Sequence, residues 1–265
     1  CPWPAGRIHM RGLDHADERE RFTMANLPYA VNEGIVTLVM DRGENRFNPD
    51  FLGEYGAILD RIEREDASVL VVTSAHPRVF SNGIDLDWVL PVLRSRDTKS
   101  FYAYVSLLAS LMRRFTLFPM FTVAAINGHA FAGGAVLSCC CDFRFMQTGR
   151  GYFCIPEVDL GVPFLPSMIA VLKKAMPLST LEELQYTGRR LTGEECRAMG
   201  IVHTACPAGT LMETALSFAG SLRKRREVIS EMKHVMYRDV IRAMDEEDPP
   251  KIEAGWHTWF MDIEL

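Results

Sequence analysis

Two glycine-containing loops carry the residue types needed to stabilise a developing negative charge. One loop, at 78–88, contains a Ser-Asn-Gly turn and follows the apolar run 68–73. The other, at 127–134, follows the apolar run 121–126 and ends in a Gly-Gly pair before a stretch typical of a buried helix. Glycine lets a backbone N–H approach a ligand closely, and the start of a helix adds its positive dipole end. Each loop can therefore offer one N–H to the same oxygen, as in an oxyanion hole.

The elements that must position these loops alternate between strands and helices. Periodicity and turn residues predict a hairpin at 29–40 and strands at 68–73, 121–126 and 142–147, with helices at 49–66, 86–95 and 99–117. After Pro166 the pattern predicts helices at 166–175, 178–187, 192–199, 209–223 and 225–244, and a short strand at 201–203. This alternation favours an α/β fold with parallel strands and crossover helices.

We expect three regions along the chain. Residues 1–23 are charge-rich with little periodicity, and we interpret them as an N-terminal extension outside the fold. Residues 24–190 are expected to form the α/β core, and residues 191–265 a helical C-terminal region.

Composition narrows the partners and the compartment. The chain has 265 residues and a net charge of −5, without a long Lys/Arg block, which argues against a nucleic-acid partner. No apolar run approaches the roughly 18 to 20 residues that span a membrane, so no membrane partner is expected. The seven cysteines include the consecutive Cys139, Cys140 and Cys141 but no C-x-x-C pair. We expect buried, reduced thiols, no metal site and an intracellular protein, with cytoplasm, mitochondrion and peroxisome all left open.

Four segments, in order and at suitable spacing, resemble the crotonase superfamily, the enoyl-CoA hydratase/isomerase fold. They are Phe80–Leu86, Asn127–Gly134, Ile155–Gly161 and Leu191–Val202, and the resemblance extends roughly from residue 29 to residue 244. It implies a ββα spiral core with a helical C-terminal trimerisation region, and hence a homotrimer or a dimer of trimers. It also implies an acyl-CoA substrate and no cofactor, because coenzyme A is part of the substrate.

The same resemblance implies roles for individual residues. The thioester oxygen would lie between the backbone N–H groups of Ile84 and Gly133, with Ala132 standing where the family usually has the first glycine of a triplet. The implied substrate- and CoA-binding positions are Ser81, Asn82, Gly83, Asp85, Gly134, Val136 and Phe164.

The carboxylates indicate which reaction this scaffold supports. The family's hydratases use two glutamates, whose positions are held here by Val136 and Glu157. A valine can neither hold nor deprotonate a water, so hydration is not expected to be efficient. One base suffices to move the double bond of a 3-enoyl-CoA into conjugation, and Glu157 would serve first as general base and then as general acid. An apolar setting that includes Val136, Val162 and Phe164 would raise its pKa.

The predicted function is therefore a Δ3,Δ2-enoyl-CoA isomerase of unsaturated fatty acid β-oxidation. The sequences at 46–50, 80–88 and 157–161 are similar to the corresponding sequences of the plant-type isomerases. Leu165 stands where other family isomerases place an acid. Two alternatives stay open: another crotonase-type acyl-CoA enzyme (a hydrolase, a decarboxylase or a weak hydratase), and a non-catalytic acyl-CoA-binding protein.

Five further features receive structural interpretations. Asp159 is expected to stabilise its loop, Asp85 to cap the helix that follows it, and Asn82 to form the turn. Lys233 is interpreted as a contact to CoA phosphates or as a solvated surface lysine. The segment 256–259, with its two tryptophans, is expected to pack against another subunit or to cover the pocket.

Overall fold

A six-stranded sheet forms the frame of the computed structural model, which describes residues 27–263. The predicted N-terminal extension, residues 1–23, lies outside the described residues. The strand order is β1-β2-β4-β7-β9-β11, and every pairing is parallel except that of β1 with β2, which form the predicted hairpin. The strands are β1 (Tyr29–Asn32), β2 (Ile35–Met40), β4 (Val69–Ser74), β7 (Phe121–Ile126), β9 (Phe143–Gln147) and β11 (Thr204–Cys206).

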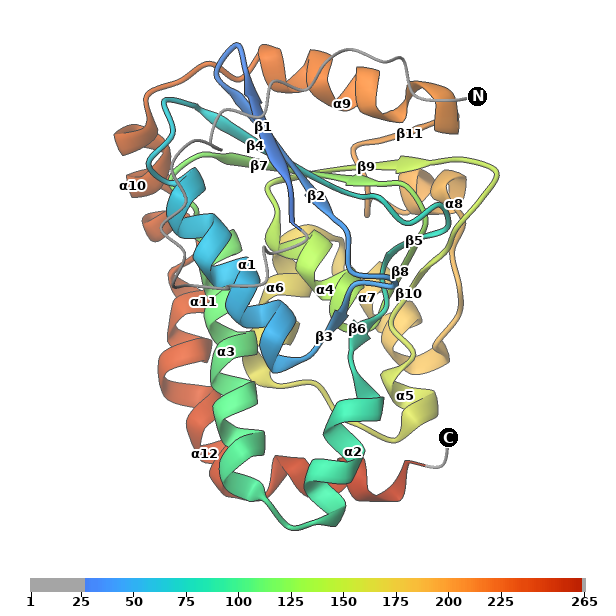
Figure 1. Ribbon diagram of the computed structural model, residues 1–265. Helices are drawn as coiled ribbons and strands as arrows, with labels where there is room; N and C mark the ends of the chain where they lie inside the picture. The colour runs from blue at the N-terminus through green and yellow to red at the C-terminus, as the bar shows by residue number, and fades with distance from the viewer. Residues whose placement is uncertain (1–26, 264–265) are drawn as a thin grey trace, which may run out of the picture.

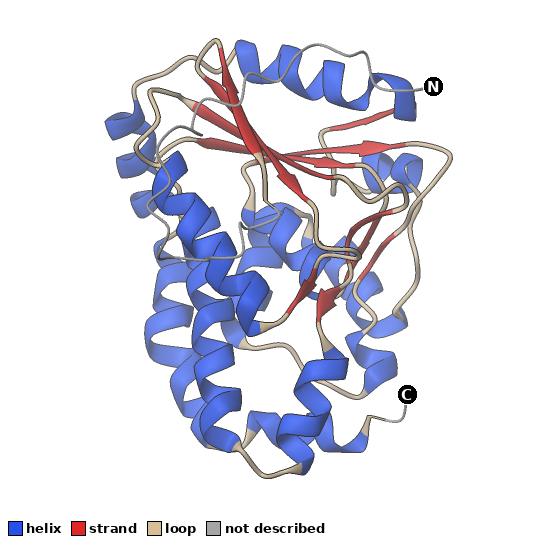
Figure 2. Ribbon diagram, viewed as in Figure 1, coloured by secondary structure: helices blue, strands red, loops and turns tan. Residues whose placement is uncertain are grey.

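Two small parallel sheets continue from the large one and carry the glycine loops (Figure 2). One has the order β10-β8-β5, and the other pairs β3 with β6. Their strands are β3 (Arg46–Phe47), β5 (Val79–Ser81), β6 (Gly83–Ile84), β8 (His129–Phe131) and β10 (Phe153–Cys154). Because β5 and β8 pair with one another, the two loops are brought to the same place in the molecule.

The helices lie mostly where periodicity predicts them (Figure 1). They are α1 (Pro49–Ile62), α2 (Leu86–Arg94), α3 (Thr98–Thr116), α4 (Gly133–Cys140), α5 (Glu157–Leu160), α6 (Pro166–Ala175), α7 (Leu178–Thr187), α8 (Gly193–Ala198), α9 (Leu211–Gly220), α10 (Arg226–Met236), α11 (Arg238–Arg242) and α12 (Asp248–Glu253), with shorter or irregular turns η1 (Ala208–Thr210), η2 (Ala243–Glu247) and η3 (Trp256–Asp262).

Two of the differences from the predicted boundaries have a clear structural origin. The predicted helix 225–244 is divided at Tyr237, where the backbone, with φ −104° and ψ 22°, leaves the helical conformation and ends α10. The strand predicted at 201–203 begins instead at Thr204, where pairing with Phe145 of β9 starts. Ile201 and Val202 are apolar because they pack into the core as a loop, which explains why their pattern was mistaken for a strand.

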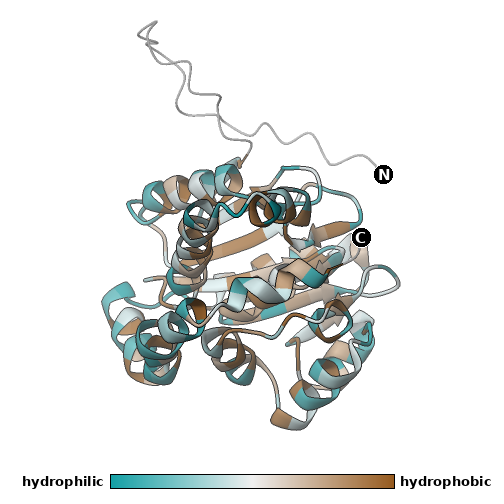
Figure 3. Cartoon of the chain, turned by 90° about the horizontal axis from the view of Figure 1, so that it is seen from below, coloured by the Kyte–Doolittle hydropathy of each residue, from teal (hydrophilic) through white to brown (hydrophobic). Residues whose placement is uncertain are grey.

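Helices cover both faces of the large sheet, so its central strands have no solvent face, whereas the edge strand β1 is largely exposed. In β4, Val69 and Val71 pack toward α9, whereas Leu70 and Val72 point into the main core. Burial on both faces explains the continuous apolar runs in place of a polar alternation. Figure 1 shows α9 alone on one side, with α1, α3, α4 and α6 on the other. Seen from below in Figure 3, hydrophobic residues follow the central strands and hydrophilic ones the outer helices.

Between residues 27 and 263, the helices are all too short or too polar to cross a membrane. The same residues contain no group of three or more His, Cys, Asp or Glu side chains placed to hold a metal ion. The six described cysteines are unpaired and buried, as expected for reduced thiols. Burial raises the pKa of the Cys140 and Cys141 thiols to about 12, so both stay protonated at neutral pH.

Candidate active site

The two glycine loops touch through their backbones. A Cβ placed on Gly83 would lie 2.4 Å from the nitrogen of Gly133, and one placed on Gly134 would lie 2.2 Å from the Ser81 carbonyl oxygen. Either contact would force the loops apart, so glycine is required at both positions. The close approach places Ile84 of β6 beside the first residue of α4. The first N–H groups of a helix have no intrahelical acceptor, so the Gly133 N–H is available to a ligand.

Hydrogen bonds from buried side chains hold the first loop in place. The Ser81 hydroxyl donates to the Asn45 carbonyl at 2.7 Å and accepts from the Gly83 N–H at 3.1 Å. The Asn45 amide in turn donates to the Phe80 carbonyl at 2.9 Å and to the Ser74 hydroxyl at 2.8 Å. Ser81 is completely buried, and its bonds go to the protein itself.

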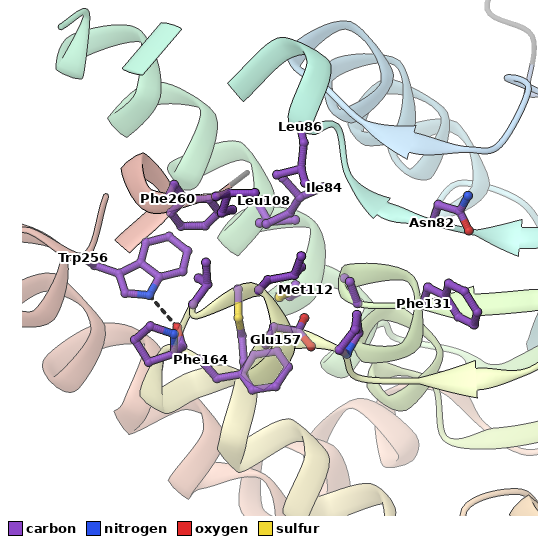
Figure 4. A pocket seen from close by; sticks show the side chains of 18 residues that line it. Asn82, Ile84, Leu86, Leu108, Met112, Phe131, Glu157, Phe164, Trp256 and Phe260 are labelled. Carbon is purple, nitrogen blue, oxygen red and sulfur yellow. Dashed lines mark hydrogen bonds between the residues drawn. The ribbon is translucent and has the colours of Figure 1, made fainter. Parts of the chain in front are cut away.

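Beside these loops lies an apolar cavity of about 170 Å³, shown in Figure 4. Among the described residues that line it, Glu157 carries the only titratable side chain. The lining consists of Asn82, Ile84, Leu86, Leu108, Met112, Phe131, Ala132, Gly133, Pro156, Glu157, Leu160, Val162, Pro163, Phe164, Met168, Trp256, Phe260 and Ile263.

The structure thus brings five of the predicted site residues to one cavity: Asn82, Ile84, Gly133, Glu157 and Phe164. Asn82 was expected to form the turn and was also an implied CoA-binding position. It contributes to the cavity wall, and its side-chain oxygen is buried with no hydrogen-bond partner among the described residues. A ligand N–H or O–H in the cavity would supply that partner.

The other predicted contact residues are not part of the cavity lining. They are Ser81, Gly83, Asp85, Gly134 and Val136. Val136 is completely buried within α4 and, contrary to expectation, does not line the cavity with Glu157. Direct contact of these five with a substrate stays a prediction.

The predicted helix cap at Asp85 is wrong. Asp85 occupies the N-cap position of α2, but its side chain makes no capping hydrogen bond. Its carboxylate accepts instead from the Asn48 amide at 3.0 Å, while the Asn48 carbonyl oxygen of the side chain caps α1. The β3–β6 pairing brings Asn48 alongside Asp85 and so gives the carboxylate a donor outside its own helix.

Glu157 is a partly buried acid whose carboxyl group lies in an apolar setting. One of its carboxyl oxygens, Oε2, has no hydrogen-bond partner among the described residues. Burial raises the pKa of Glu157 to about 8, and its own backbone N–H opposes part of that rise. Val162 and Phe164 line the same cavity, as predicted for its neighbours. A carboxyl with a pKa near the working pH can both accept and return a proton.

The raised pKa makes activity depend on pH in a defined direction. For a reaction in which Glu157 is the base, only the deprotonated free enzyme reacts, so kcat/KM should rise roughly tenfold per pH unit up to about pH 8 and then level off. Steady-state rates between pH 5.5 and 9 would measure this profile. A flat profile from pH 6 to 9 would contradict the assignment of Glu157 as the base.

Asp159 lies two residues further along the chain, and its loop-stabilising role stays a prediction. It is exposed and absent from the cavity lining. Its carboxylate packs against Gly188 at the end of α7, where an added Cβ would lie 2.4 Å from Oδ2.

Lys233 corrects a prediction, since it neither faces solvent nor can reach a CoA phosphate. Its side chain is 3% exposed and pairs with Asp142 at 2.6 Å. The ammonium also donates to the carbonyls of Phe118 and Met120, at 2.9 and 2.7 Å. All three of its N–H donors are therefore used inside the protein.

Ala132 stores backbone strain where the second loop becomes α4. Its φ of 50° and ψ of −125° belong to a region that glycine adopts far more readily. The conformation is held by its N–H, which donates to the Cys154 carbonyl at 3.0 Å, and by its carbonyl, which accepts from the Val136 N–H at 3.1 Å. Strain of this kind costs about 1–3 kcal/mol.

Replacing Ala132 with glycine should therefore stabilise the protein. We expect the free energy of unfolding to rise by about 1 kcal/mol, since relief of strain exceeds the added entropy of the unfolded chain. Denaturant titration would measure it, with Ala135→Gly inside α4 as the matched control, which should destabilise. Equal destabilisation by both substitutions would show that Ala132 is not strained.

Sequence analysis missed much of the cavity wall. Leu108 and Met112 of α3, and Trp256, Phe260 and Ile263 of the C-terminal segment, all line it. Periodicity places the first two on a buried helix face but does not distinguish a core from a cavity. For the C-terminal segment, the aromatic residues were a signal, and of the two expected roles the structure favours covering the pocket.

A six-stranded sheet continued by two small parallel sheets, two touching glycine loops and an acid in an apolar cavity together define an enzyme of the crotonase class. The chain belongs to the enoyl-CoA hydratase/isomerase family, whose model matches residues 30–260. The chain is 30% identical to enoyl-CoA delta isomerase 3 of Arabidopsis thaliana, over 76% of this chain and 87% of that protein. The peroxisomal enoyl-CoA delta isomerase 2 of the same plant is 30% identical over 64% of this chain and 72% of its own.

Other similarities carry a hydratase name. A putative enoyl-CoA hydratase of Thermus thermophilus is 30% identical over 73% of this chain and 77% of its own. Among solved structures, a probable enoyl-CoA hydratase of Mycobacterium tuberculosis has a TM-score of 0.78 at 23% identity, covering 86% of this chain and 95% of that one. The structural match shows the crotonase fold, and both names belong to one family.

Proposed function

We propose that the protein is a Δ3,Δ2-enoyl-CoA isomerase that acts in the β-oxidation of unsaturated fatty acids. The observation that carries the proposal is the single acid in the cavity: Glu157 is present, and Val136 occupies the position of the second hydratase carboxylate. The delta isomerase names of the Arabidopsis relatives support the same activity.

The proposed reaction moves one proton and two electron pairs. Glu157, as carboxylate, removes a proton from C2 of the 3-enoyl thioester, and the electrons of that C–H bond pass into a dienolate. The negative charge on the thioester oxygen is stabilised by the N–H groups of Ile84 and Gly133. As the C2=C3 bond forms, C4 takes the proton back from Glu157, which returns to its carboxylate form.

Hydration needs a second group that the cavity lacks. A water attacking C3 must be oriented and deprotonated while another proton is delivered to C2. Glu157 is the only titratable side chain among the described lining residues, and Val136 is buried and is not one of them. One acid can carry out both proton transfers of the isomerisation, whereas hydration needs a second group besides it.

Turnover of purified protein on 3-hexenoyl-CoA tests this proposal. The conjugated thioester is followed by ultraviolet absorbance, and crotonyl-CoA serves as the hydration substrate. Rapid conjugation with negligible hydration is the expected result. Faster loss of crotonyl-CoA than conversion of 3-hexenoyl-CoA would overturn the proposal in favour of a hydratase.

We further propose that the enzyme works in an intracellular compartment without a cofactor, since the coenzyme A moiety arrives with the substrate. A homotrimer or a dimer of trimers is the proposed assembly. An exposed apolar face on α10, formed by Val228, Met232, Val235 and Met236, is the surface that a second copy would cover. Light scattering of the purified protein would test the assembly, and a monomeric mass would contradict it.

A further inference from the structure

The C-terminal segment closes one end of the cavity. Trp256 and Phe260, four residues apart in η3, and Ile263 just beyond it are 6%, 3% and 5% exposed, and all three line the cavity. The rings of Trp256 and Phe260 meet edge to face with centroids 5.0 Å apart. Together they form a compact aromatic wall.

This wall is fixed to the rest of the protein. The Trp256 indole N–H donates to the Pro163 carbonyl at 2.7 Å, in the loop that follows Glu157. Phe101 of α3 packs against both rings, at 6.2 Å from Trp256 and 5.8 Å from Phe260. A hydrogen bond of 3.2 Å between Tyr102 and His257 adds another tie to α3. Side chains locked in this way present a wall of defined position.

The cavity has two chemically different ends. Figure 4 shows Asn82 and Phe131 at one end, Trp256 and Phe260 at the other, and Glu157 between them. The polar Asn82 suits the amide-rich portion of a CoA ester, whereas the aromatic end offers only apolar contacts. An acyl chain whose reacting carbons lie beside Glu157 must therefore continue toward the aromatic wall.

We infer that Trp256 and Phe260 set an upper limit on acyl chain length, so that the substrates are short-chain 3-enoyl-CoA thioesters. A cavity of about 150 Å³ holds a molecule of roughly six carbons, and this one measures about 170 Å³. A longer chain has to displace an aromatic side chain held by packing and by the bond to Pro163. The inference rests on the proposed isomerase function for its reaction and on the cavity alone for its size limit.

Chain-length profiles of wall variants test the inference. For wild type, Trp256→Ala and Phe260→Leu, kcat/KM would be measured on 3-hexenoyl-CoA and 3-decenoyl-CoA. Each additional buried methylene raises affinity about fourfold. We expect wild type to prefer the six-carbon substrate. In each variant, the kcat/KM on 3-decenoyl-CoA divided by that on 3-hexenoyl-CoA should rise at least tenfold. Trp259→Ala is the matched control, because Trp259 lies in the same segment but is 53% exposed and outside the lining; its ratio should equal that of wild type.

Calorimetric binding of hexanoyl-CoA and decanoyl-CoA separates this inference from the proposed activity. Without turnover on any 3-enoyl substrate, a wild-type preference for hexanoyl-CoA that is relieved in the variants would still support the wall. If Trp256→Ala does not fold, Phe260→Leu and the milder Ile263→Ala decide the matter. An unchanged ratio in variants that fold, or a wild-type preference for the ten-carbon ligand, would overturn the inference.

Discussion

Glu157→Gln is expected to lower kcat for 3-hexenoyl-CoA conjugation about a thousandfold, within the range typical of general acid–base groups. Glutamine preserves the shape of the side chain but can neither take the C2 proton nor deliver one to C4. The Ile84 and Gly133 N–H groups are untouched, so KM should change less than about threefold. Progress curves at saturating substrate would measure kcat, and calorimetry with hexanoyl-CoA would check binding.

The stability of the same variant shows whether lost activity reflects lost folding. A carboxyl whose pKa is raised to about 8 in the folded state binds its proton more tightly folded than unfolded. Below the unfolded pKa near 4.3 the carboxyl is protonated in both states, so it does not alter the free energy of unfolding. As the pH rises from there to about 8, the unfolded state releases this proton and the folded state keeps it, so the free energy of unfolding falls. Glu157→Gln should therefore melt like wild type at pH 4 and at a higher temperature at pH 9.

Asp159→Asn provides the matched control, since it removes an exposed carboxylate two residues away. Its kcat should stay within about twofold of wild type. A stable Glu157→Gln protein with wild-type kcat would rule Glu157 out as the acid–base group. It would favour another acyl-CoA reaction or a binding protein.

The parts of the site that sequence analysis could predict depend on local chemistry. Gly83 and Gly134 are required because a single Cβ would collide with the backbone of the opposite loop. The two glycines in the sequence therefore indicate that the backbone is approached closely at these positions. Glu157 was predicted from a motif of seven residues, and its neighbours Val162 and Phe164 follow within the same stretch. Strands such as β4 were predictable because a run buried on both faces is apolar throughout.

The parts that were missed depend on contacts between distant segments. Trp256 meets Pro163 across 93 positions of the chain, and nothing in either local pattern indicates the other. Asp85 has the residue type of a helix cap, yet the β3–β6 pairing brings Asn48 to its carboxylate. A charged residue on a helix of mainly polar character suggests solvent, and Lys233 shows how tertiary structure overrides that expectation.

Lys233→Met is expected to destabilise the protein by about 3–5 kcal/mol, the usual cost of leaving a buried charge without its partner. The ammonium holds α10 against the start of β7 and β9, where Asp142 also accepts from the N–H and hydroxyl of Thr122, at 2.8 and 3.0 Å. Methionine fills similar space but leaves the Asp142 carboxylate without its opposite charge and the carbonyls of Phe118 and Met120 without the ammonium donor. Denaturant titration measures the loss.

Two further variants identify the cause of that loss. Lys224→Met, at an exposed position before α10, should change the free energy of unfolding by less than about 0.5 kcal/mol. The double variant Lys233→Met/Asp142→Asn should recover part of the stability, because it removes the uncompensated charge. A contact to CoA phosphates would instead raise KM for every CoA ester and leave stability unchanged. That outcome would contradict the role of the buried Lys233–Asp142 ion pair in stability. A loss of stability with a wild-type KM would show that Lys233 stabilises the fold and does not bind CoA.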